Sequence, residues 1–291
     1  IMSKIAILTD SSCDIPQEMA EKYGIDIMSF HILLDDVDYV ERESCTNTEF
    51  YDKMRLSKGV PSTAAITPIQ FCEKYCQYVD EGYTDVIHVP INKSGSSTYN
   101  NALMAQGMLR EERPEHHMKI HLLDPHTYSM VFGWYLCEMA RKLKNGAEIS
   151  HVIQEFEKQM NCMEIILGPY SLKQMKKSGR ISAAAAVMGE LMGVRPIITL
   201  IDGKTKVESK VRGDDKVVPA MIDLCKKRTE GVEDFDYMIG HTSIPQAAEL
   251  EKACRKAFGR APLTTFNLGG VVSANTGPDT LALVYVGKAR D

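Results

Sequence analysis

The feature that most constrains the fold of this 291-residue chain is a repeated order in its first half: a short apolar run, a polar loop, then apolar residues at helical spacing. Four apolar runs have the length of buried strands, namely residues 5–8, 25–30, 86–90 and 121–124. Helical patterns begin near residues 16, 48, 68, 99 and 129. Strands that alternate with helices predict βαβ units, and therefore a parallel sheet with helices on both faces.

Polar loops precede the helices of this half at residues 10–14, 62–67, 92–98 and 124–129. The carboxyl ends of parallel strands meet at one edge of a sheet, and ligands of such folds bind at that edge. We therefore expect these four loops to gather at one edge and to contain the binding site.

After about residue 160 the pattern changes to strands that follow one another more closely. Strands are expected at residues 164–167, 196–201, 205–211, 237–241, 264–268 and 281–286, and helices at 172–177, 183–192, 214–228 and 247–258. Asp202-Gly203 lies between two strand patterns and predicts a tight antiparallel hairpin. The chain is therefore expected to be a two-domain α/β protein, with a parallel-sheet domain over residues 1–160 and an α+β domain with a mixed or antiparallel sheet over residues 161–291.

Charge and hydropathy exclude several classes of protein. The 34 basic and 39 acidic residues give a net charge of −5 without long runs of one sign, which argues against a nucleic-acid partner. The longest apolar stretches are far shorter than the roughly 20 residues that span a bilayer. The first ten residues lack the basic-then-apolar layout of a secretion signal, and the eight cysteines form no CxxC pair. These features predict a cytoplasmic protein with reduced cysteines.

Motifs for metal binding or catalysis are missing from the sequence. Cys72 and Cys76 are one helical turn apart, but no second pair of ligands has matching spacing. Asp10 ends the first strand, yet Ser12 stands where a phosphotransfer site needs a second acid, and no GxSxG is present. His31 follows a strand and could face a cleft, although ordinary packing explains it more simply. We therefore expect neither a metal nor a nucleophile.

The loop at residues 92–98 (NKSGSST) is the most suggestive local feature, because its hydroxyls and free N–H groups precede a helix and suit a carboxylate or a phosphate. The simpler explanation is that Ser96, Ser97 or Thr98 caps that helix. The spacing is not that of a P-loop. In the loop at residues 62–67, Thr67 precedes Pro68 as a cap, whereas Thr63 has no such local role and could donate to the same anion.

Together and in this order, these segments resemble the DegV family of bacterial fatty-acid-binding proteins, and the resemblance spans nearly the whole chain. The N-terminal half carries TDSSCD at residues 9–14, PSTAAITP at 61–68 and INKSGSSTYN at 91–100, which are similar to the family's TDSSxD, PxTSQPSP and ISSxLSGTYQ. The C-terminal half carries LKQMKKSGRIS at 172–182, GHT at 240–242 and NTGPDT at 275–280, which are similar to LxxLxKGGRIS, GHTD and HTGPGT.

The resemblance implies one long-chain fatty acid in a cleft between the two domains, and no other cofactor. The carboxylate would be held by hydroxyl and N–H groups of two N-terminal loops, from Thr63, Gly95, Ser96 and Ser97. A second set would lie nearby: His31, Arg180, Arg212, Asn275 and Gly277. The acyl tail would need an apolar tunnel, with candidate lining residues at 181–194, and the sixteen methionines of the chain suit such a wall.

Some members of the family present the bound acid to a separate fatty acid kinase, and the resemblance implies such a kinase and transient membrane contact during lipid exchange as candidate partners. This chain departs from the family pattern at positions linked to that delivery: Asn275 replaces a histidine, Asp279 replaces a glycine, and residues 213–215 (GDD) replace a basic segment. Asparagine donates hydrogen bonds but carries no proton to transfer. We expect a binding protein, not an enzyme, in which ligand binding is retained and delivery to a kinase is altered or lost.

Two other interpretations remain open. One takes the serine-rich loop as a phosphate cradle in a small-molecule phosphate-binding enzyme of the dihydroxyacetone-kinase-like class, although no nucleotide motif supports it. The other takes the protein as a regulatory module whose cleft binds a different small acid. Identification of the bound ligand distinguishes all three.

Overall fold

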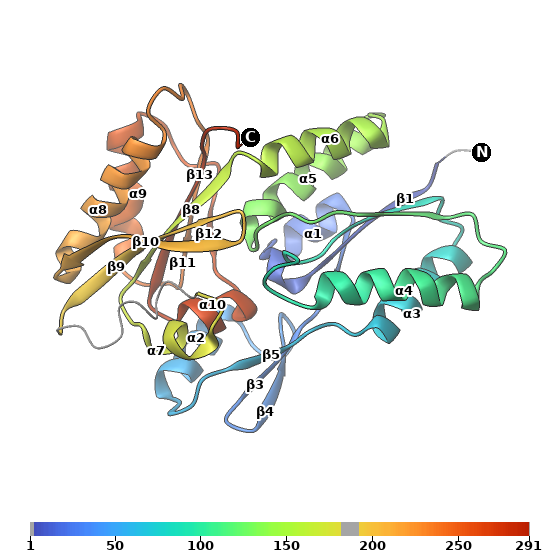
Figure 1. Ribbon diagram of the computed structural model, residues 1–291, viewed down its shortest axis with the longest axis horizontal. Coiled ribbons are helices and arrows are strands. Elements are labelled where there is room, and N and C mark those ends of the chain that lie inside the picture. Colours follow the sequence, from blue (N-terminus) through green and yellow to red (C-terminus); the bar gives the residue numbers. More distant parts are fainter. Residues whose placement is uncertain (1–2, 182–191, 291) are drawn as a thin grey trace. The chain divides into compact units, whose positions relative to one another are not determined.

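A computed structural model describes residues 3–181 and 192–290 and divides the chain into two compact units (Figure 1). The first unit contains Ile1–His31 and Ala64–Glu157, and the second contains Ile32–Thr63 and Lys158–Asp291. The helix expected over residues 183–192 lies outside the described residues except for Met192. None of the helices within the described ranges has the length and apolar content that crossing a membrane requires.

The sheet of the first unit has four parallel strands in the order β2-β1-β6-β7. β1 (Ile5–Asp10) lies between β2 (Ile25–Met28) and β6 (Asp85–Val89), and β7 (Lys119–Leu122) pairs with β6. The central strands are apolar and buried because helices cover both of their faces. The predicted parallel sheet is therefore confirmed.

Helices connect these strands, with α1 and α5 on one side of β1 and α3 and α4 on the other (Figure 1). At the start of α3, Thr67 accepts a hydrogen bond from the backbone N–H of Gln70, whose side chain returns to Thr67, and Pro68 occupies the first turn. Thr46 likewise accepts from the N–H of Glu49 at the start of α2 in the second unit. The helices of the first unit are α1 (Gln17–Tyr23), α3 (Pro68–Asp80), α4 (Thr98–Glu112) and α5 (Met130–Lys144), and α6 (Ile149–Met160) continues into the second unit.

The second unit contains a six-stranded mixed sheet in the order β10-β9-β8-β13-β11-β12. All neighbours are antiparallel except β11 and β12. Asp202 and Gly203 both have positive φ, 51° and 70°, as a tight hairpin of the predicted type requires. The strands are β8 (Met163–Pro169), β9 (Val194–Ile201), β10 (Lys204–Arg212), β11 (Tyr237–His241), β12 (Thr265–Asn267) and β13 (Thr280–Val286).

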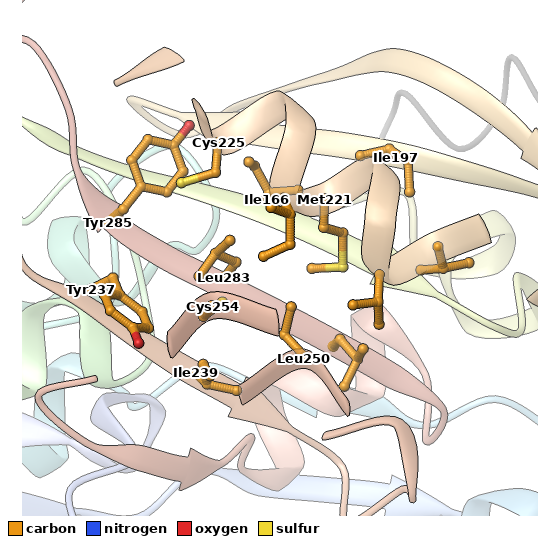
Figure 2. Packing of buried hydrophobic residues seen from close by; sticks show 14 residues of the cluster. Ile166, Ile197, Met221, Cys225, Tyr237, Ile239, Leu250, Cys254, Leu283 and Tyr285 are labelled. Atoms are coloured by element: carbon orange, nitrogen blue, oxygen red, sulfur yellow. The ribbon is translucent and has the colours of Figure 1, made fainter. Parts of the chain in front are cut away.

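The core of the second unit lies between this sheet and two helices, as Figure 2 shows. Ile166 and Leu283 from the sheet meet Met221 and Leu250 from the helices, and all four are fully buried. Complete burial of such side chains contributes about 1.5–3 kcal/mol each. Gly168 permits the close approach, because a Cβ there would lie 2.5 Å from the Met221 sulfur. The two helices of this core are α8 (Val217–Arg228) and α9 (Gln246–Phe258), and the unit also contains α7 (Lys173–Ser178) and α10 (Gly270–Thr276).

One charged group is buried beside this core. Glu164 is 4% exposed and accepts hydrogen bonds from the Nε and Nη2 of Arg228 at 2.6 and 2.7 Å and from the Tyr285 hydroxyl at 2.6 Å. A bidentate arginine and a hydroxyl compensate for the lost hydration of the carboxylate.

The break between the units at Glu157 and Lys158 lies near the expected boundary at residue 160, whereas residues 32–63, expected in the first domain, belong to the second unit. In this part of the chain β4 (Val37–Val40), β3 (His31–Leu34) and β5 (Ser62–Ala64) form a small sheet, and α2 (Asn47–Leu56) lies between β4 and β5 in sequence.

Two long-range hydrogen bonds explain why the segment joins the C-terminal part of the chain. Glu41 accepts from the backbone N–H of Val271 at 3.1 Å, and the Tyr51 hydroxyl donates to the carbonyl of Leu268. Both Glu41 and Tyr51 are buried, so these contacts fix the segment on residues near α10.

Candidate functional site

The 92–98 loop lies between β6 and α4, at the carboxyl edge of the parallel sheet. Ser96 Oγ accepts a hydrogen bond from the backbone N–H of Thr98 at 3.2 Å and lies 2.8 Å from the Thr98 hydroxyl. When Thr98 donates in that second contact, Ser96 accepts two bonds and keeps its own proton for a ligand oxygen. Ser96 is half-buried, so this proton is held in a sheltered position.

The N-cap residue of α4 provides no side-chain cap, and Ser96 satisfies only the first N–H of the helix, that of Thr98. Ser97 occupies the N-cap position and is exposed, but its hydroxyl makes no capping hydrogen bond. The first N–H groups of a helix have no partner within the helix, and together with the helix dipole they favour an anion. The Lys93 ammonium, 5.3 Å from the centre of the Tyr99 ring, adds positive charge at this loop. The loop thus combines a hydroxyl, free N–H groups and a cation.

Gly95 has a packing role in the same loop. The side chain of Asn92 is 3% exposed, donates to Ser94 Oγ at 2.9 Å and lies across Gly95. A Cβ at residue 95 would lie 2.9 Å from Asn92 Oδ1 and 3.0 Å from Nδ2, closer than ordinary contact. Gly95 therefore makes room for the buried amide that shapes the loop.

Asp10 holds this loop in place, a role that the sequence analysis missed. The carboxylate is fully buried at the end of β1; it accepts from the N–H of Ile91 at 2.8 Å, from the N–H of Ser12 at 3.0 Å and from the Ser12 hydroxyl. Burial raises the pKa of Asp10 to about 6, against the lowering effect of these hydrogen bonds. Its position at a strand end was the available signal.

Two further hydrogen bonds join the loops of the first unit. The Asn92 N–H donates to the carbonyl of Thr127 at 3.1 Å, and the Lys93 N–H donates to Asp124 Oδ1 at 3.2 Å. The loops at residues 10–14, 92–98 and 124–129 therefore meet at one sheet edge, as predicted. The loop expected at 62–67 differs, because Thr63 lies in strand β5 and belongs to the second unit.

Thr63 is half-buried and belongs to the second unit, whereas Ser96 belongs to the first. The remaining predicted residues are spread over several elements. His31 is half-buried at the start of β3, Arg180 is exposed and donates to the carbonyl of Ser178 at 3.1 Å, and Arg212 is exposed at the end of β10.

Asn275 and Gly277 come together at the end of α10. The amide of Asn275 donates to the carbonyl of Val271 at 3.0 Å, one helical turn earlier. Gly277 has a φ of +93°, which explains the glycine, and its N–H donates to the carbonyl of Ser273 at 2.7 Å. The NTGPDT segment at residues 275–280 therefore begins inside a short helix.

Arg55 fixes the following loop, and nothing in the sequence indicated this role. Its Nε and Nη2 contact Asp279 Oδ1 at 3.1 and 3.0 Å, and its Nη2 also donates to the carbonyl of Pro278 at 2.7 Å. Asp279, one of the departures from the family pattern, thus has a cation in its own unit. In the 213–215 departure, Asp214 pairs with Arg195 at 2.8 Å.

Metal chemistry has no support in the described part of the chain, since no group of three or more His, Cys, Asp or Glu side chains there is placed to hold an ion. The eight cysteines all lie within the described residues and are free thiols.

The fold and the site define a class: two-unit α/β proteins with a serine-containing loop at the carboxyl edge of a parallel sheet. The chain belongs to the DegV family. The family model, described as "uncharacterised protein, DegV family", matches residues 4–288.

Relatives and solved structures match this chain over nearly its full length. A DegV domain-containing protein of Clostridium perfringens (strain 13 / Type A) is 28% identical and covers 98% of this chain and 99% of its own. A stearic acid-binding protein from Eubacterium ventriosum has a TM-score of 0.89 at 22% identity, covering 98% and 99% of the two chains. A fatty-acid-binding DegV family protein from Thermus thermophilus has a TM-score of 0.85 at 23% identity, covering 98% and 100%. The fold is that of the family.

Proposed function

We propose that this protein binds a long-chain fatty acid and that the 92–98 loop receives its carboxylate. The observation that carries the proposal is the arrangement of Ser96 at the start of α4: its Oγ accepts from the Thr98 N–H, and its proton is available to a ligand oxygen when the Thr98 hydroxyl donates to it. Family members with this fold are described as binding stearic acid and other fatty acids. A carboxylate needs charged-acceptor hydrogen bonds, and this loop offers them.

The affinity would come from two sources. Each hydrogen bond to the carboxylate contributes about 1.5–3 kcal/mol, and each buried methylene of the tail contributes about 0.8 kcal/mol. The role of Thr63 as a second hydroxyl rests on the family resemblance and on its half-buried position in β5. The proposed tail-lining segment, 181–194, lies mostly outside the described residues.

The protein would act as a cytoplasmic carrier and not as an enzyme, with transient membrane contact during lipid exchange. Asp10, the one buried carboxylate at the candidate site that resembles a nucleophile, is bonded at both oxygens. Delivery to a fatty acid kinase would be weakened, because the Asn275 amide is bonded within α10 and carries no proton to transfer.

The proposal is tested by titrating ligand-free protein with stearate and comparing Ser96→Ala with Thr67→Ala. Both variants lose a hydroxyl that accepts from a backbone N–H near a helix start, at 3.2 Å in each case. Ser96→Ala should weaken stearate binding about tenfold or more, since one charged hydrogen bond is lost. Thr67→Ala should leave it unchanged. Equal affinity in wild type and Ser96→Ala would refute the role of the loop.

Delivery is tested separately with a fatty acid kinase from a related bacterium, by comparing the wild type with Asn275→His. We expect acyl phosphate formation to increase in Asn275→His at unchanged stearate affinity. Full turnover by the wild type would show that delivery is intact and would overturn this part of the proposal alone.

A further inference from the structure

A surface groove of about 690 Å³ lies between α3 and α4 in the first unit, away from the 92–98 loop. The floor is formed by Cys72, Cys76 and Met108, and Ile69 lies at the end near the helix starts. At the other end, Arg113 closes the groove by a bidentate contact with Asp80 at 2.9 and 3.0 Å. From Ile69 to Asp80, α3 spans about 16 Å. Three turns of a further helix would fit along it.

The outer face of α4 carries two large apolar side chains among polar residues such as Asn100 and Arg110. The inner residues Ala102, Ala105 and Leu109 are at most 1% exposed, as in any packed helix. On the outside, however, Leu103 is 47% exposed and Met104 is 60% exposed.

Ile69 of α3, 61% exposed, lies at the N-terminal end of the same pair of helices. An exposed apolar surface beside a groove is typical of a protein-binding site.

The rim of the groove is acidic. Glu73 and Glu112 line it and, within residues 3–181 and 192–290, neither takes part in an ion pair, whereas the one arginine of the groove is held by Asp80. Burial raises the pKa of Cys72 to about 11, and the charges of Glu112 and Glu73 add to the increase. The negative charges of the two carboxylates therefore reach the groove floor and favour a cation there.

We propose that this groove binds a basic amphipathic helix of another protein. The apolar face of such a helix would cover Met104 and Met108, whose flexible side chains adapt to a partner. Its lysines or arginines would pair with Glu73 and Glu112. A second copy of this chain would bring acidic rims together, and an anionic membrane would be repelled by them, so the charge of the groove selects a basic partner.

The first test uses fluorescence anisotropy to measure how two fluorescein-labelled helical peptides of about five turns bind to the full chain. One peptide is made of leucine and lysine, the other of leucine and glutamate. The Leu/Lys peptide should bind, and Glu73→Lys with Glu112→Lys should weaken it about tenfold or more. The matched control reverses two exposed acids on α1, Glu18→Lys with Glu21→Lys, and should bind like the wild type. Equal loss in the control, or equal binding of the Leu/Glu peptide, would overturn the proposal.

The second test uses the thiols of the chain as internal probes. Cys76 lines the groove and Cys162 lies in the other unit, and both are half-buried. The Leu/Lys peptide should slow the alkylation of Cys76 by N-ethylmaleimide and leave Cys162 unchanged; equal protection of both, or of neither, would contradict the site.

A wild-type dimer that Met104→Ser dissociates in sedimentation would assign the groove to a second copy. Binding to phosphatidylglycerol vesicles that Met104→Ser abolishes would assign it to a membrane. Either result would overturn the proposed partner.

Discussion

Substitution of Gly95 by alanine should destabilise the 92–98 loop through one identifiable contact. The new Cβ would lie 2.9 and 3.0 Å from the two terminal atoms of the Asn92 amide, where ordinary contact begins near 3.4 Å. The amide is 3% exposed and bonded to Ser94, so it can yield only by leaving its rotamer or this bond, at about 0.5–1.5 kcal/mol for each. Gly95 does not have positive φ, and alanine therefore also gains about 0.4–1 kcal/mol from the unfolded state. When the amide leaves both its rotamer and its hydrogen bond, the net loss is about 0–2.6 kcal/mol.

A double-mutant cycle isolates this contact. In the Asn92→Ser background the amide is gone, so Gly95→Ala should become neutral or stabilising by about 0.4–1 kcal/mol. The assay is urea unfolding of the four proteins, with stearate affinity as a second readout, since a displaced loop should also bind the carboxylate less well. An equal cost of Gly95→Ala in both backgrounds would refute the packing role assigned to Asn92.

Three further predictions concern buried and paired charges. Glu164→Gln should lower the free energy of unfolding by about 3 kcal/mol, because it leaves Arg228 without its anion; a loss below about 1 kcal/mol in urea unfolding would contradict this. Burial raises the pKa of Asp10 to about 6, so the folded state binds this proton more tightly than the unfolded state does. The free energy of unfolding should therefore fall by about 3 kcal/mol as pH rises from about 4 to 6. Asp10→Asn should lack this slope in unfolding measured across that range, and an unchanged slope would be the contrary result. His88 acts in the opposite direction, since burial lowers its pKa to about 3 and stability is lost as pH falls below about 6; His88→Gln should remove that loss in the same titration.

Local signals predicted many of the elements. Thr67 begins α3 as expected, and Thr46 begins α2 close to the expected start near residue 48, because a side-chain oxygen one step before a helix satisfies a backbone N–H whatever the rest of the chain does. Asp202-Gly203 predicted its hairpin because glycine accepts positive φ. Asp35 and Asp36 form a similar turn with φ of 51° and 62°, yet they lack the glycine that makes such turns visible in a sequence.

Long-range contacts account for what the sequence did not reveal. Residues 32–63 join the second unit through partners more than 200 positions away, such as Tyr51 with Leu268 and Arg55 with Asp279. No local pattern encodes these pairs. The 92–98 loop, by contrast, was recognisable, because a glycine and several hydroxyls before a helix have few structural uses besides capping and anion binding. Asp10 was considered only as a nucleophile, since its role in holding Ile91 depends on the register of β1 against β6.

The central claim, that this DegV family protein binds a fatty acid through the 92–98 loop, is tested most directly by identifying the ligand that it carries. The purified chain is denatured and extracted, and the extract is analysed by mass spectrometry beside that of Ser96→Ala. The account predicts about one equivalent of a long-chain fatty acid from the wild type and clearly less from the variant. A phosphorylated metabolite in its place, or protein that remains empty after incubation with stearate, would contradict it.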